Sequence, residues 1–188
     1  MNSLSDNALM LKVKSGEVDK LGLLYERYKK MLLGFFFKMN HDLEASEDLV
    51  QNVFVRILKY KHTFTGSGKF STWMYHLARN MYFDQYKKNK KNAKNIDVDS
   101  VSYKLLDENN IDDQMYQNEQ QLQLKRALCE LRPEKRELLI LSRYQELKYH
   151  EIAEVVGISE GAVRVKIHRT LKELKEIFFK LENTTHGY

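Results

Sequence analysis

The chain has 188 residues and a formal net charge of +5, with 43% hydrophobic and 30% charged residues. This composition is typical of a soluble globular protein and excludes a wholly disordered chain. The apolar runs are too short to cross a bilayer, no signal sequence opens the chain, and the single cysteine excludes an intramolecular disulfide. We therefore expect a cytoplasmic protein without membrane insertion.

The first half of the chain predicts a helical domain. Apolar residues recur at helical spacing from Leu21 to Met39, and a second helix is expected from Ser46, whose hydroxyl can cap it. The segment Thr63–Gly68 is predicted to be a loop, and a third helix begins near Phe70. The expected inward stripes are Leu21, Leu24, Tyr25, Tyr28, Leu32, Phe35 and Met39, then Leu49, Val50, Val53, Phe54 and Ile57, then Phe70, Met74, Leu77 and Met81.

Charge and periodicity both change in the middle of the chain. Gln85–Asn95 holds five lysines and no acid, whereas Ile96–Gln121 holds seven acids and one lysine. Helical periodicity fades there and returns with Leu124, Ala127, Leu128 and Leu131, and Pro133 suits the first turn of a further helix. The fold predicted is all-α, with two small helical domains, residues 1–92 and 119–188, joined by a flexible acidic linker, residues 93–118.

The most distinctive motif is a helix-turn-helix between about Tyr149 and Leu171. Gly157 suits a sharp turn, and Ser159 is a good N-cap for a helix predicted to run to about Phe179. Ala153 is small enough for two helices to cross closely, while Val163 fills the space between them. Two helices of an ordinary bundle could also meet at a glycine.

The exposed start of the second helix is the candidate duplex-DNA surface. In a major groove, Arg and Lys reach guanine edges or phosphates, and Ala or Val contact thymine methyl groups. The candidate contacts are Ser159, Glu160, Ala162, Arg164, Val165, Lys166 and Arg169.

Three blocks of sequence carry a resemblance to a known family. They read EASEDLVQNVFVRIL from Glu44, FSTWMYHLARNMYFDQY from Phe70, and LRPEKRELLILSRYQELKYHEIAEVVGISEGAVRVKIHRTLKELKE from Leu131. Their order and separation closely resemble the extracytoplasmic-function (ECF) sigma factors of bacterial RNA polymerase. The opening LMLKVKSGEVDKLGLLYERYKKML also looks like that family's first helices.

The resemblance implies a promoter-specificity subunit of RNA polymerase. The first domain would bind the clamp coiled-coil of the largest subunit and capture melted bases of the −10 element. The second domain would bind the −35 duplex and touch the flap, and the linker would enter the RNA channel. The resemblance also implies an anti-sigma factor as a partner, and the free protein is expected to be a monomer.

Residue chemistry in the first domain agrees with these roles. On the predicted helix from Ser46, a polar face opposite the apolar stripe could bind core polymerase through Asp48, Gln51, Asn52 and Arg56. Aromatic, amide and cationic side chains near the third helix suit single-stranded DNA, where bases stack on rings and phosphates meet cations. These candidates are Lys69, Trp73, Tyr75, Arg79, Asn80 and Lys87.

Several of these candidates have an alternative interpretation. Trp73 could belong to the core, and Tyr75 is the better surface candidate. Asp48 and Gln51 could be an ordinary solvated face, and the lysine block could be a solubilising helix end. A further candidate is the loop Lys61–Lys69, which could form a pocket for a base flipped out of the duplex. The acidic linker could be a spacer, although its charge would also suit an RNA channel.

Three positions depart from the family pattern. Lys148 stands where a Ser or Thr usually caps the first helix of the motif. A lysine side chain cannot accept the hydrogen bond from the helix amide, and the loss of that hydrogen bond would cost about 1 kcal/mol. Val165 replaces a small polar residue, and Asn52 replaces a usual Glu.

Two other functions compete with this interpretation. A helix-turn-helix regulator that recruits polymerase without replacing sigma would explain the motif, but not the aromatic helix of the first domain. An enzyme is disfavoured because the sequence has no phosphate-binding glycine motif and no metal-ligand spacing among its six histidines and Cys129. The paired acids Asp97/Asp99 and Asp112/Asp113 lie in the predicted linker. We expect no enzymatic activity, no cofactor and no metal.

Overall fold

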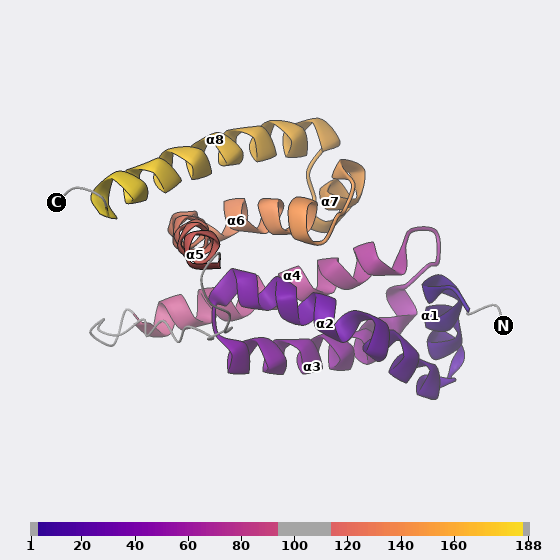
Figure 1. The fold of residues 1–188 in the computed structure, drawn as a ribbon. Coiled ribbons are helices and arrows are strands. Elements are labelled where there is room, and N and C mark those ends of the chain that lie inside the picture. The colour runs from indigo at the N-terminus through magenta and orange to yellow at the C-terminus, as the bar shows by residue number, and fades with distance from the viewer. Residues whose placement is uncertain (1–3, 94–113, 186–188) are drawn as a thin grey trace.

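Figure 1 shows the computed structural model, in which residues 4–93 and 114–185 are described and side chains over residues 4–91 and 120–183. The described residues form helices and short helical turns, as the sequence predicts. The N-terminal unit contains α1 (Asp6–Ser15), η1 (Val18–Lys20), α2 (Leu21–Asn40), α3 (Leu43–Tyr60), η2 (Lys61–Thr63) and α4 (Phe70–Ala93). The C-terminal unit contains α5 (Gln114–Glu130), α6 (Pro133–Leu139), η3 (Ile140–Tyr144), α7 (Tyr149–Val156) and α8 (Glu160–Thr185).

The core of the N-terminal unit follows the predicted apolar stripes. Every predicted inward residue of α2 and α3 is buried except Tyr25, which is half-buried against Phe54. On α4, Phe70, Met74 and Met81 are buried and Leu77 is partly buried. Helical periodicity therefore predicts which faces of these three helices meet.

The start of α3 differs from the prediction. Asp42, not Ser46, is the N-cap, and its carboxylate accepts a hydrogen bond of 3.0 Å from the amide of Ala45. Ser46 is fully buried one turn later, where its hydroxyl donates to the carbonyl of Asp42 or to the side chain of Asn40. Asp42 caps the helix because it lies one residue before the helix begins, where its carboxylate can reach the free amides of the first turn.

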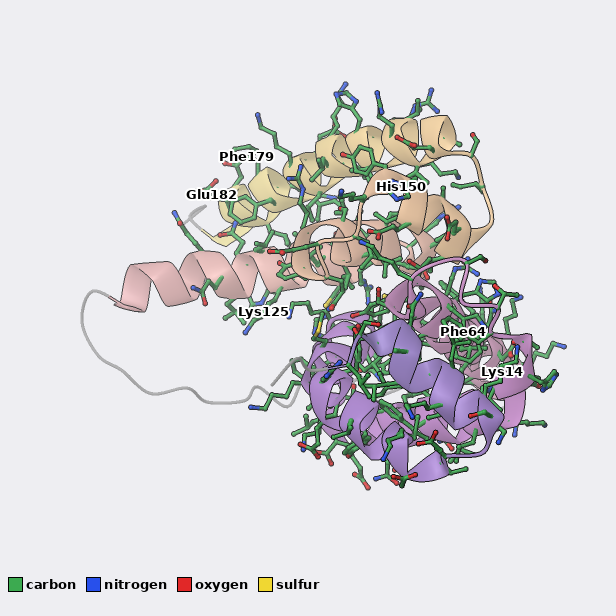
Figure 2. All side chains as sticks on the ribbon, turned by 90° about the vertical axis from the view of Figure 1, so that its right-hand side faces the viewer. Lys14, Phe64, Lys125, His150, Phe179 and Glu182 are labelled. Carbon is green, nitrogen blue, oxygen red and sulfur yellow. The ribbon has the colours of Figure 1, made fainter. Side chains whose placement is uncertain are left out.

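The loop before α4 is tied to α1 by one side chain. The side-chain Nδ2 of Asn7 donates to the backbone carbonyls of Gly66 and Gly68, at 3.3 and 2.8 Å. Its amide oxygen accepts from the backbone N–H of Phe70 at 2.8 Å, which satisfies a free donor at the start of α4. Nearby, Lys14 donates to the carbonyl of Phe64 at 2.7 Å, and Figure 2 shows these two residues together.

The C-terminal unit contains the predicted helix-turn-helix. Gly157 has the left-handed φ of 73° that glycine adopts most easily, and the Ser159 hydroxyl accepts from the amide of Ala162 at 3.2 Å. At Lys148 the missing cap is partly replaced, because Glu151 accepts from the Lys148 amide at 2.8 Å. Pro133 occupies the first turn of α6 as predicted, and α8 continues past Phe179 to Thr185.

The two units pack against each other through α4 and α7 and share one hydrophobic core. Arg136 of α6 joins them, because its buried guanidinium donates to the carbonyl of Met39 in α2 at 2.6 Å. The same guanidinium donates to the carbonyls of Leu128, Cys129 and Leu131. Among the residues that the structure describes, no helix is both long and apolar enough to cross a membrane.

Candidate nucleic-acid interface

The predicted duplex-DNA residues share one exposed face of α8. Val163, Ile167 and Thr170 point into the protein and are buried, whereas the positions between them are open to solvent. Of the predicted contacts, Ala162 is partly exposed and the other six are exposed: Ser159, Glu160, Arg164, Val165, Lys166 and Arg169. Figure 2 shows nitrogen-bearing side chains projecting from α8 away from the N-terminal unit.

The geometry of the turn positions this face. Val163 is completely buried and Ala153 is partly buried against the core, so α7 and α8 cross closely as expected. Arg164 pairs with Glu160 one turn earlier at 3.3 Å, and both side chains remain well exposed. Such an exposed pair is weak, so the guanidinium can exchange it for a DNA phosphate or base.

A second candidate surface is a groove of about 630 Å³ between α3 and α4. Four of the predicted single-strand residues line it, namely Trp73, Arg79, Asn80 and Lys87. Four further lining residues were not predicted from the sequence: Tyr60, His76, Phe83 and Asp84, whose carboxylate lies 3.6 Å from Arg56. An aromatic wall with cationic and amide groups on its rim suits unstacked bases and their phosphates.

The sequence-based ranking of Trp73 and Tyr75 is wrong. Trp73 is partly exposed in the groove, where its ring lies 5.3 Å from that of Phe64. Tyr75 is completely buried against Phe35, and its hydroxyl donates to Gln145 of the C-terminal unit at 2.5 Å. Burial raises the pKa of this hydroxyl above its ordinary value.

Two predicted DNA-binding cations are paired with acids of the C-terminal unit. The Arg79 Nε lies between the two oxygens of Glu137, 3.0 Å from Oε1 and 3.2 Å from Oε2. Burial raises the pKa of Glu137 to about 7, although Arg79 acts to lower it. Lys69 lies 2.6 Å from Glu151. Burial alone would raise the pKa of Glu151, but hydrogen bonds from Lys69 and the Lys148 amide bring it below its ordinary value.

The polar face of α3 is exposed as predicted. Asp48, Gln51 and Asn52 are open to solvent, while Arg56 is partly exposed and lies 3.6 Å from Asp84 of α4. Val55 is 62% exposed on the same helix, and the sequence reasoning did not single it out. A single exposed apolar side chain is ordinary on a protein surface, so Val55 by itself does not identify a binding face.

The remaining predicted features lie at the ends of α4. Lys87, Lys88, Lys90 and Lys91 are exposed near its C-terminus, whereas Lys94 and residues 97–113, including both acidic pairs, lie outside the described residues. Before α4, Thr63 lines the groove, but the glycine part of the loop is held toward α1 by Asn7.

Comparison with known proteins places both units in known families. Residues 24–92 match the family described as Sigma-70 region 2, and residues 121–174 match Sigma-70, region 4. The chain is 31% identical over 157 residues to ECF RNA polymerase sigma factor SigX of Bacillus subtilis (strain 168), a match that covers 82% of this chain and 81% of SigX. It is 29% identical over 163 residues to RNA polymerase sigma factor YlaC of the same strain, over 84% of this chain and 91% of YlaC.

Two solved structures share the fold. CnrH, in complex with the cytosolic domain of CnrY, matches with a TM-score of 0.69 and 19% identity, over 93% of this chain and 97% of that one. Sigma factor RpoE from Bartonella quintana, in complex with the anti-sigma factor NepR, matches with a TM-score of 0.66 and 20% identity, over 84% and 95% of the two chains.

Proposed function

Because this chain belongs to the ECF RNA polymerase sigma factors, we propose that it binds core polymerase and assigns the two steps of promoter recognition to its two units. The C-terminal unit reads the −35 duplex, and the N-terminal unit captures melted −10 bases. The observation that carries this assignment is that the exposed face of α8 and the groove beside α4 are separate surfaces of different chemistry.

The face of α8 fits a duplex. Its first two turns present cations and a hydroxyl beside apolar Ala162 and Val165, the groups that read guanine edges, phosphates and thymine methyl groups. The buried Val163 and Ile167 fix the orientation of α8, so these side chains are presented together. We assign −35 recognition to Ser159, Glu160, Ala162, Arg164, Val165, Lys166 and Arg169.

The groove beside α4 fits a single strand. Trp73 offers a ring for stacking, Asn80 can hydrogen-bond a base edge, and Lys87 lies where a phosphate would meet a cation. A base stacked on an aromatic ring contributes about 1–3 kcal/mol, which is comparable with the cost of about a few kcal/mol for taking one base out of the duplex. Arg79 lines the same groove, and Lys69, just before α4 and outside the groove, is a separate proposed phosphate contact.

The exposed face of α3 is the proposed site for core polymerase, through Asp48, Gln51, Asn52 and Arg56, with Val55 as an apolar contact. We propose that its target is the clamp coiled-coil of the largest subunit and that the C-terminal unit contacts the flap. An anti-sigma factor is a further proposed partner, since both similar structures described above are complexes. The protein itself is proposed to be non-enzymatic, because it directs the chemistry of the polymerase.

Variants of single faces test this assignment. Gln51→Ala should weaken association with core polymerase, and Arg169→Ala should weaken duplex binding by roughly tenfold or more. Lys12→Ala is the control, because Lys12 is partly exposed on α1 and pairs only locally with Glu17. The assignment fails if Gln51→Ala and Arg169→Ala each behave like the control in pull-down and anisotropy assays.

A further inference from the structure

Two hydrogen bonds fix the orientation of one polar side chain in the groove beside α4. The Nδ1 atom of His76 lies 3.1 Å from the backbone carbonyl of Val155, and a carbonyl oxygen can only accept a hydrogen bond. The side-chain Nδ2 of Asn80 lies 3.0 Å from Nε2 of the same imidazole, and an amide nitrogen can only donate. The imidazole is therefore neutral, with its proton on Nδ1 and a lone pair on Nε2.

These contacts decide which end of the Asn80 amide is free. The amide nitrogen is used by His76, one turn earlier in α4, so the amide oxygen faces away from the imidazole. Both residues line the groove, where His76 is exposed and Asn80 is partly exposed. Over the described residues, no protein donor is paired with the Asn80 oxygen. Asn80 therefore offers the groove a hydrogen-bond acceptor because His76 holds its nitrogen.

Two neighbouring groups of the groove are acceptors as well. The Asp84 carboxylate lies one turn after Asn80 on the same helix, with Arg56 as its partner at 3.6 Å. The Thr63 hydroxyl donates to the carbonyl of Tyr60 at 2.8 Å, so its oxygen is left to accept. Acceptors at these three positions favour a base edge that donates, while the cations of the groove suit phosphates.

The bases differ in the group that they present to such an acceptor. Adenine and cytosine carry an exocyclic amino group, whereas thymine carries a carbonyl oxygen at the corresponding position. A carbonyl oxygen opposite the Asn80 oxygen would leave two acceptors without a proton between them, and an unpaired polar group is costly to hold away from water. The orientation of one amide thus discriminates between classes of base.

We propose that His76 is a positioning residue that holds the Asn80 oxygen toward the groove, so that the groove prefers a base with an exocyclic amino group, adenine or cytosine, over thymine. His76 acts through Asn80 and does not itself have to touch the base. This inference rests on the proposed function and adds to it the class of base that the groove captures.

The tautomer of His76 can be measured in the full chain without DNA. In protein with isotope-labelled histidine, long-range proton–nitrogen correlations distinguish a protonated Nδ1 from a protonated Nε2. We expect the His76 proton on Nδ1 near about pH 8, with the signal assigned by its absence from His76→Leu. A proton on Nε2 would reverse the Asn80 amide and overturn the proposal.

Fluorescence anisotropy measures the base preference of the full chain. Two labelled single strands of about eight nucleotides are compared, one of thymidine and one of 5-methyldeoxycytidine. Their bases share the ring and the methyl group, but 5-methylcytosine has an amino group where thymine has a carbonyl oxygen. One additional hydrogen bond should make the wild-type protein bind the 5-methyldeoxycytidine strand about two- to tenfold more tightly.

His76→Leu separates positioning from a purely structural role. Without the imidazole, the Asn80 amide can turn and donate to the thymine oxygen, so the thymidine strand should gain affinity and the preference should fall below about 1.5-fold. In an Asn80→Ala background, His76→Leu should have no further effect on the preference. His168→Leu is the control, because it makes the same change at an exposed histidine of α8 that does not line the groove.

The positioning role is overturned if wild-type protein shows no preference, or if His76→Leu keeps the preference of the control or weakens both strands equally. The proposed function has its own readout, because Trp73→Ala should weaken both strands about fivefold or more if bases stack in the groove. Unchanged binding by Trp73→Ala would refute the groove as the single-strand site, and this inference with it. A normal effect of Trp73→Ala without any base preference would refute only the role of His76.

Discussion

The buried carboxylate of Glu137 gives the most quantitative prediction. Burial outweighs the attraction of Arg79 and raises the pKa from 4.5 to about 7, and the neighbouring Glu134 adds to the increase. The folded protein therefore holds this proton more tightly than the unfolded chain. Between about pH 4.5 and pH 7 the group makes the free energy of unfolding fall as pH rises. At 1.36 kcal/mol per pKa unit, the loss reaches about 3 kcal/mol above pH 7.

Glu137→Gln removes this titration and keeps a neutral side chain of similar shape. We expect its free energy of unfolding in urea to match wild type near about pH 4 and to exceed it by up to about 3 kcal/mol near pH 8. Glu176→Gln is the control, because it makes the same charge change at an exposed position of α8 that does not act on the pKa of Glu137. A difference that is flat with pH, or that favours wild type at pH 8, would mean that the Arg79 pair outweighs burial and would refute the reasoning.

Three further predictions concern packing and the turns. Ile167→Ala should lower the free energy of unfolding by about 2–5 kcal/mol, whereas the exposed Val165→Ala should stay within about 0.5 kcal/mol of wild type; equal urea midpoints would contradict the assigned face of α8. Gly157→Ala should lower the free energy of unfolding by about 1–2 kcal/mol, because alanine is strained in the left-handed backbone, whereas Gly34→Ala in α2 should raise it by about 0.5–1 kcal/mol. Shifts of the same sign in the thermal unfolding midpoints of the two variants would contradict these backbone conformations. Asn7→Ala should speed amide exchange at Phe70 while exchange in α3 stays unchanged, and an unaltered Phe70 amide would count against the loop tether.

The sequence predicts the parts of this molecule that depend on local periodicity and turn chemistry. The stripe from Leu21 to Met39 and the turn at Gly157 are both confirmed, because spacing of apolar residues and a left-handed glycine are local properties. The exposed face of α8 follows from the same periodicity. Ser46 shows the limit of such reasoning, since a better-placed cap four residues earlier replaces it.

Contacts between distant segments could not be predicted from one sequence. Tyr75 lies beside the predicted inward stripe of α4, but Phe35 and Gln145 cover it from two other parts of the chain. The pairing of Arg79 with Glu137 also joins residues of different units. In the sequence each of them is only an isolated charge on a helix, and nothing local indicates a partner.

Run-off transcription with purified core polymerase and a randomised promoter library, with this protein as the sole specificity factor, tests the central claim most directly. We predict transcripts from a subset of templates that share two separated elements, one upstream in duplex form and one at the melted region. Transcription that occurs only when another sigma factor is added would contradict the claim and would identify the protein as a recruiting regulator.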